Sequence, residues 1–163
     1  MPATSVEDLL NQTATDLEQL RDQYAGLARE LERKNISELH ARAKAQFVEL
    51  LVSREDQTIA ALRGYLDADE PHAELDVHVR LGGEFPQTAD DLRLPAKPSI
   101  DDLVQIAERT DERLALLSER IKIYTLSGGL FQALAAFETL VVNRQRQLAA
   151  AVRELDQDMP TPT

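Results

Sequence analysis

The sequence predicts an all-α protein, a single four-helix bundle made of two helical hairpins joined by a long crossover. Apolar residues recur at helical spacing in four stretches, 5–34, 37–67, 99–124 and 128–157. Residues 68–98 lack this period and contain Gly82-Gly83, Pro95 and Pro98. This connection is far longer than the about two to eight residues usual between bundle helices. We therefore expect it to run the length of the bundle and to leave the second and third helices parallel.

Composition limits the partners. The 163 residues suffice for one domain, and 43% hydrophobic with 4% aromatic residues suits an aliphatic helical core. The net charge of −11 is dispersed along the chain. Nucleic acids and anionic membranes both require clustered Lys and Arg, so neither is an expected partner.

The chain has no cysteine, which excludes thiolate catalysis, cysteine-based zinc sites and disulfides. Its first residues, MPATSVEDLL, lack the basic and apolar regions of a signal peptide. No apolar run approaches the ~18 residues of a membrane span. A cytoplasmic protein is the expectation.

The first helix is expected to begin at Ser5, where Ser5 to Asp8 fits a capping pattern. A second such box at Asn35–Glu38 either opens the second helix or marks a kink in one longer helix. The first stripe is uninterrupted and amphipathic: Val6, Leu10, Thr13, Leu17, Leu20, Tyr24, Leu27 and Leu31.

In the crossover, apolar residues from Leu75 to Leu81 alternate with polar ones, which predicts an extended segment with one face on the bundle. Leu92 and Leu94 are expected to anchor the segment that follows. Ser99 and Asp102 form a third capping box, which opens the third helix.

Three of the four helices lose their apolar stripe for about one turn. These polar windows are SREDQT at 53–58, ERTDER at 108–113 and NRQRQ at 143–147. A turn takes about 3.6 residues, so some polar side chains of each window must face the interior.

The two hairpins and the crossover resemble the ferritin-like, rubrerythrin-like superfamily. The segments ELLVSREDQTIAALRGYL and ALAAFETLVVNRQRQLAAAVREL are similar to its second and fourth helices. The resemblance implies a ferritin-like bundle. For active members of the superfamily, the resemblance also implies two bound metal ions. These are held by a carboxylate from each of two helices and by a Glu-x-x-His motif from each of the other two.

This chain departs from that motif. In the Glu-x-x-His pattern, Thr58 takes the place of the histidine after Glu55, and Val141 takes its place after Glu138. Carboxylates for such a site would come from Asp22, Glu55, Glu112 (or Glu108) and Glu138. A valine cannot ligate and a threonine hydroxyl is a weak ligand for iron or manganese, so we expect no metal and no cofactor.

The expected alternative is a polar, metal-free centre. Arginine has a permanent charge and five donors, so it can hold the carboxylates that a metal would hold. The residues expected there are Arg54, Glu55, Thr58, Thr110, Glu138 and Arg144, with Arg109 and Arg113 in the same windows.

The histidines, His40, His72 and His78, match no established zinc spacing. No phosphate loop, nucleophile elbow or dinucleotide fingerprint is present. No catalytic residue is predicted.

The leading hypothesis is a non-enzymatic interaction or structural protein that forms a homodimer. Its surplus apolar residues would be Leu9, Phe131, Leu140 and Val142. The alternative is a metal-binding ferritin-like oxidoreductase with unusual ligands. A third possibility, a regulator that senses a small molecule in the bundle centre, depends on the polar windows alone.

Overall fold

Four long helices make up the protein. They are α1 (Val6–Arg33), α2 (Leu39–Leu66), α3 (Ile100–Tyr124) and α4 (Gly128–Asp158). The computed structural model describes residues 4–33, 39–67, 78–79, 92–124 and 128–158. Every helix bound lies within two residues of its expected position, so the prediction of an all-α four-helix bundle is confirmed.

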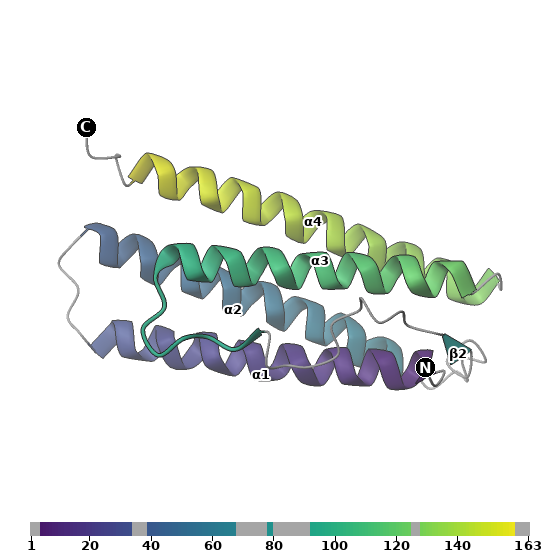
Figure 1. The fold of residues 1–163 in the computed structure, drawn as a ribbon. Helices are drawn as coiled ribbons and strands as arrows, with labels where there is room; N and C mark the ends of the chain where they lie inside the picture. The colour runs from purple at the N-terminus through teal and green to yellow at the C-terminus, as the bar shows by residue number, and fades with distance from the viewer. Residues whose placement is uncertain (1–3, 34–38, 68–77, 80–91, 125–127, 159–163) are drawn as a thin grey trace.

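The topology is also the expected one. Helices α1 and α2 form one antiparallel hairpin, and α3 and α4 form the other (Figure 1). Helix α2 ends at the end of the bundle opposite to the start of α3, so these two helices run parallel. The connection between them must therefore span the bundle, as its length predicts.

Two short strands lie outside the helices. Strand β1 (Thr4–Ser5) pairs antiparallel with β2 (His78–Val79), with Thr4 opposite Val79 and Ser5 opposite His78. The expected extended segment at 75–81 is described only at β2. Strand β1 was not predicted, because two residues are too few to show an alternating pattern.

The last part of the crossover is fixed to the first hairpin. Leu92 is buried in the core, and the Leu94 N–H donates to Gln23 Oε1 of α1 at 2.7 Å. Lys44 Nζ of α2 donates to the Pro98 carbonyl at 2.6 Å. These contacts to α1 and α2 position the start of α3.

Serine caps begin α1 and α3. Ser5 Oγ accepts from the Asp8 N–H at 3.1 Å. At α3 the capping box is reciprocal: Ser99 Oγ accepts from the Asp102 N–H at 3.1 Å, and Asp102 Oδ2 accepts from the Ser99 N–H at 2.9 Å. The expected box at 35–38 lies outside the residues whose structure is described.

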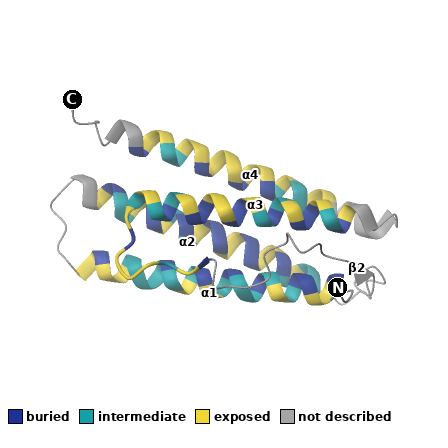
Figure 2. Ribbon diagram, in the orientation of Figure 1, coloured by how far each residue is buried: buried dark blue, intermediate teal, exposed yellow. Residues whose placement is uncertain are grey.

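The apolar core has two parts. One contains residues from the first half of α1 and the second halves of α2 and α3, among them Leu17, Leu62 and Leu117. The other lies toward the opposite end and includes Phe47, Leu103 and Leu148. Figure 2 shows the buried residues on the faces that the helices turn toward one another. Leu9, expected as surplus surface, is only 8% exposed and packs in the first part.

None of the helices in the described ranges combines the length and apolarity needed to cross a lipid bilayer.

Candidate functional site: a buried charge network

A buried polar layer lies between the two parts of the core. It takes residues from all three polar windows: Arg54, Glu55 and Thr58 from α2, Thr110 and Asp111 from α3, and Arg144 from α4. None of these residues is more than 3% exposed. Sequence windows 33 to 90 residues apart therefore meet at one level of the bundle.

Arg144 is the centre of this network. It forms a two-pronged contact with Glu55, in which Nη2 donates to Oε1 at 2.6 Å and Nη1 donates to Oε2 at 3.2 Å. Its Nε donates to Asp111 Oδ1 at 2.9 Å, and Nη1 also donates to Thr58 Oγ1 at 2.6 Å. The paired, planar geometry is the one that favours arginine over lysine.

Arg54 completes the charge balance by pairing with the same Asp111. Its Nη2 donates to both carboxylate oxygens of Asp111, each at 2.6 Å. Two guanidinium groups and two carboxylates are thus buried together, with no net charge. Such balance is required because burying an unpaired ion lowers the stability of the fold by roughly several kcal/mol.

The two arginines differ in their environments. Burial, and then the like charge of Arg144, lower the pKa of Arg54 below its ordinary value. Burial alone would also lower the pKa of Arg144, but the charges of Glu55 and Asp111 and their hydrogen bonds raise it. Arg144 uses all three of its nitrogens, whereas Arg54 Nε and Nη1 have no hydrogen-bond partner in the described part of the chain. Both side chains remain charged.

Tyr24 brings α1 to the network. It is 0% exposed, and its hydroxyl also has no hydrogen-bond partner among the described residues. Burial raises the pKa of Tyr24, and the negative charge of Glu55 raises it further. The phenol therefore stays neutral beside the ion pairs.

The threonines bond mainly to helix backbone. Thr58 Oγ1 donates to the Arg54 carbonyl at 3.0 Å while it accepts from Arg144. Thr110 Oγ1 donates to the Ile106 carbonyl at 2.7 Å. Thr110 is thus buried as expected, but its hydroxyl proton is used within its own helix.

Glu138 is not in the bundle centre, so that expectation is wrong. Its side chain is 38% exposed, and its carboxylate lies 3.4 Å from Lys122 Nζ of α3. The carboxylate that fills the centre instead is Asp111, which was not among the residues expected there. Its spacing carries a signal, because Asp111 lies four residues after Ala107 and three before Leu114, both of which are buried.

The four candidate metal ligands do not converge. Asp22 is 71% exposed and pairs with the neighbouring Arg21, while Glu112 is exposed on the outside of α3. Only Glu55 lies in the centre, and Arg144 holds it. Nowhere in the described ranges do three or more His, Cys, Asp or Glu side chains gather as a metal site would require.

The described residues therefore do not fit the di-metal group of the ferritin-like superfamily. All four oxygens of Glu55 and Asp111 accept hydrogen bonds from guanidinium groups. A divalent cation would have to displace permanent cations and then lie beside them. The side chains of His40, His72 and His78 lie outside the described part of the structure.

Arg109 and Arg113, which also belong to the polar windows, are less buried than the residues of the network. Arg109 is exposed, and Arg113 is half-buried near Asp16 of α1. Desolvation raises the pKa of Asp16, although a hydrogen bond from Gln12 and the charge of Arg113 oppose the shift. Asp16, Arg113 and the crossover residue Leu92 line a small pocket of about 50 Å³ between α1 and α3.

A larger groove runs between α3 and α4. It has a volume of about 480 Å³, and its lining combines charged and apolar side chains: Glu108, Asp111, Glu112, Gln145, Leu148, Ala149, Val152 and Arg153. The groove is on the outside of the bundle, and the buried Asp111 lies at its floor.

Comparison with known proteins adds no family: no protein-family model, no curated protein and no solved structure matches this chain.

Proposed function

We propose that this chain is a non-catalytic helical bundle that acts as an interaction or structural protein and associates with a second copy of itself. The observation that carries the first part is the complete pairing of the carboxylates in the polar centre. Every carboxylate oxygen of Glu55 and Asp111 already accepts a guanidinium hydrogen bond. No side chain in this layer is left as a base, a nucleophile or an open ligand, which supports a structural role.

The network also favours one arrangement of the helices. Arg144 must meet Glu55 of α2 and Asp111 of α3 at the same level. A shift of α4 by one turn would move it about 5.4 Å and leave buried charges unpaired. A ferritin-like ancestry, in which arginines took the place of metal ions, is consistent with this geometry and stays a prediction.

Self-association is supported by the thin packing of α4. Among residues 135–155 of α4, the buried ones are Val141, Arg144, Leu148 and Leu155. Most of the rest of this range is exposed, as the predominantly yellow outer side of the helix in Figure 2 shows. Val142, expected from the sequence as surplus apolar surface, is 43% exposed. Leu140 is half-buried, and the side chain of Phe131 lies outside the described residues.

Metal analysis tests the non-catalytic part of the proposal. We expect protein purified from iron- and manganese-supplemented medium to carry far less than one metal ion per chain. Its melting temperature should not change on treatment with a chelator, because guanidinium groups hold the central carboxylates. Elemental analysis and thermal melts with and without chelator provide the two measurements.

A matched control is the triple variant Asp22→Asn, Glu112→Gln and Glu138→Gln, which removes the three candidate ligands outside the centre. It should match the wild type in metal content. Stoichiometric iron or manganese in the wild type, lost together with stability on chelation, would instead favour the oxidoreductase.

Light scattering over a concentration series tests the second part. We expect a dimer, and a monomer at every concentration would refute self-association. The cytoplasmic location expected from the sequence stays a prediction, which imaging of a tagged chain would test.

A further inference from the structure

The outward surface formed by α3 and α4 carries a separated charge pattern. Gln105, Glu108, Glu112, Leu116 and Glu119 are exposed on α3 at spacings of three and four residues, so they share one helix face. Three of these five side chains are acidic and none is basic.

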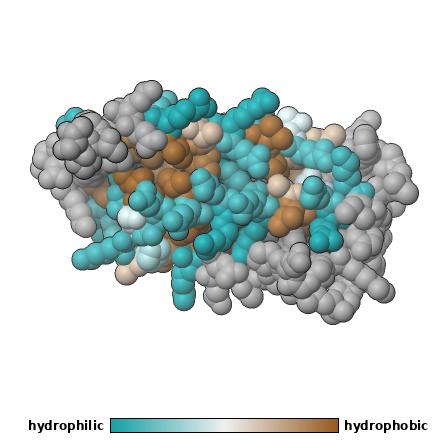
Figure 3. Space-filling view, turned by 45° about the horizontal axis from the view of Figure 1, so that its top comes forward, coloured by the Kyte–Doolittle hydropathy of each residue, from teal (hydrophilic) through white to brown (hydrophobic). Residues whose placement is uncertain are grey.

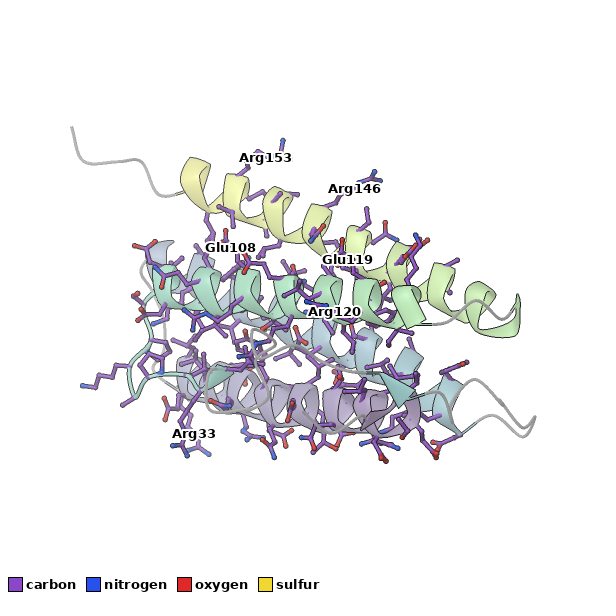
Figure 4. All side chains as sticks on the ribbon, turned by 45° about the vertical axis from the view of Figure 1, so that its right-hand side comes forward. Arg33, Glu108, Glu119, Arg120, Arg146 and Arg153 are labelled. Carbon is purple, nitrogen blue, oxygen red and sulfur yellow. The ribbon has the colours of Figure 1, made fainter. Side chains whose placement is uncertain are left out.

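One stripe on the exposed side of α4 is basic. It carries Val142, Arg146, Ala149 and Arg153, again three and four residues apart. Figure 4 shows Glu108 and Glu119 on the side of α3 that faces α4, and Arg146 and Arg153 pointing away from α3 at the outer side of α4. Glu108, Glu112 and Arg153 border the groove of about 480 Å³.

Apolar side chains continue this surface beyond the groove. Leu116 and Val142, 39% and 43% exposed, are the two large hydrophobic residues that are exposed in the described part of the chain. Asp111 contacts Arg144, and Lys122 contacts Glu138 across the same antiparallel helix pair. Leu116, midway between Asp111 and Lys122, is therefore level with Val142. Figure 3, with the top of the molecule turned forward, shows hydrophobic side chains exposed among hydrophilic ones.

We propose that this α3/α4 surface is where a second copy of the chain docks, related by a two-fold axis parallel to the helices. This inference rests on the self-association proposed above. A rotation of this kind places α3 of one copy over α4 of the other, antiparallel, and keeps every residue at its own level. Acidic α3 then faces basic α4 twice, because a two-fold interface repeats each contact.

The levels of the side chains agree with this arrangement. Leu116 faces Val142 of the second copy, and Glu112 comes within about one helical turn of its Arg146. Glu108 similarly approaches the second copy's Arg153, since both residues border one end of the groove. A two-fold axis across the helices would instead place α3 on α3, with carboxylates against carboxylates. Charge complementarity therefore selects the first arrangement.

A charge-swap experiment tests the surface. Arg146→Glu and Glu112→Arg should each weaken the dimer at least about tenfold, because each places like charges together at two symmetric positions. An equimolar mixture of the two variants should dimerise as the wild type does, since both contacts then join opposite charges. Sedimentation velocity measures all three samples, and circular dichroism melts check their folding.

Matched controls lie on α1, on the far side of the bundle from α4 (Figure 1). Arg29→Glu and Glu30→Arg are exposed swaps of the same kind and should leave the dimer unchanged. Because the natural chain has no cysteine, Leu116→Cys mixed with Val142→Cys gives a second readout. Mild oxidation should form a disulfide-linked dimer from this mixture, and a mixture with Glu30→Cys in place of Val142→Cys should not.

Each outcome decides a different point. A wild type that is monomeric at all concentrations overturns self-association itself and this surface with it. A dimer that ignores both swaps, or swaps that the mixture fails to rescue, overturns only the α3/α4 surface. Rescue by the mixture together with the selective cross-link supports it.

Discussion

Arg144 of α4 holds Glu55 of α2 through two hydrogen bonds, at 2.6 and 3.2 Å, although 89 residues separate them in the sequence. The two side chains are 3% and 1% exposed. Each depends on the other, because neither charge has access to water. The contact therefore links the second hairpin to the first at the middle of the bundle.

Replacing Arg144 by leucine should lower the free energy of unfolding by about 3–5 kcal/mol, because Glu55 is left as an unpaired buried charge. Chemical denaturation monitored by circular dichroism measures the change. The control Arg42→Leu alters an exposed arginine on α2 and should shift stability by no more than about 0.5 kcal/mol. Equal losses in both variants would contradict the network as a source of stability.

Removing Glu55 as well should restore stability. The double variant Arg144→Leu with Glu55→Leu eliminates the orphaned carboxylate and leaves the Arg54–Asp111 pair intact. We expect it to unfold at a higher denaturant concentration than Arg144→Leu alone. In the matched control, Glu138→Leu is added to Arg144→Leu. Glu138 lies outside the network, so this addition should give no rescue, and rescue by both second substitutions would disprove a specific coupling.

Tyr24→Phe should raise the free energy of unfolding by about 1 kcal/mol. The Tyr24 hydroxyl is buried without a hydrogen-bond partner in the described structure, and such a group costs free energy that phenylalanine does not incur. Thr58→Val tests the opposite case, because its hydroxyl accepts from Arg144. It should destabilise the protein by about 1–3 kcal/mol. A less stable Tyr24→Phe variant would show that the hydroxyl has a partner in solution.

Asp16→Asn should stabilise the protein at neutral pH, and the gain should disappear in acid. Burial raises the pKa of Asp16 above its ordinary value of 3.8, so the folded state disfavours the charged form. The penalty is fully present above the raised pKa and vanishes below 3.8, where the folded and unfolded states are both protonated. Urea denaturation of both proteins across this pH range measures the difference. A gain that is constant with pH would refute the assignment, and Asp22→Asn at an exposed carboxylate is the control.

The sequence determined the helices, their bounds and the parallel course of α2 and α3. Helical periodicity, the caps at Ser5 and Ser99 and the length of the crossover are local properties, so a single chain displays them. It also determined that α2, α3 and α4 each turn polar side chains inward for about one turn, and that arginines rather than histidines accompany the carboxylates in these windows.

Only the tertiary structure decided which carboxylates enter the centre. Glu138 is spaced three residues before Val141, as an inward residue would be, yet it lies beside Lys122 at the bundle surface. Asp111, between two glutamates of the same window, reaches Arg54 and Arg144 instead. The helical period fixes the direction in which a side chain points around the axis of its own helix. The partner that the side chain meets depends on the relative level of the neighbouring helices. This level is set jointly by the packing of the two core regions and by the need to pair every buried charge.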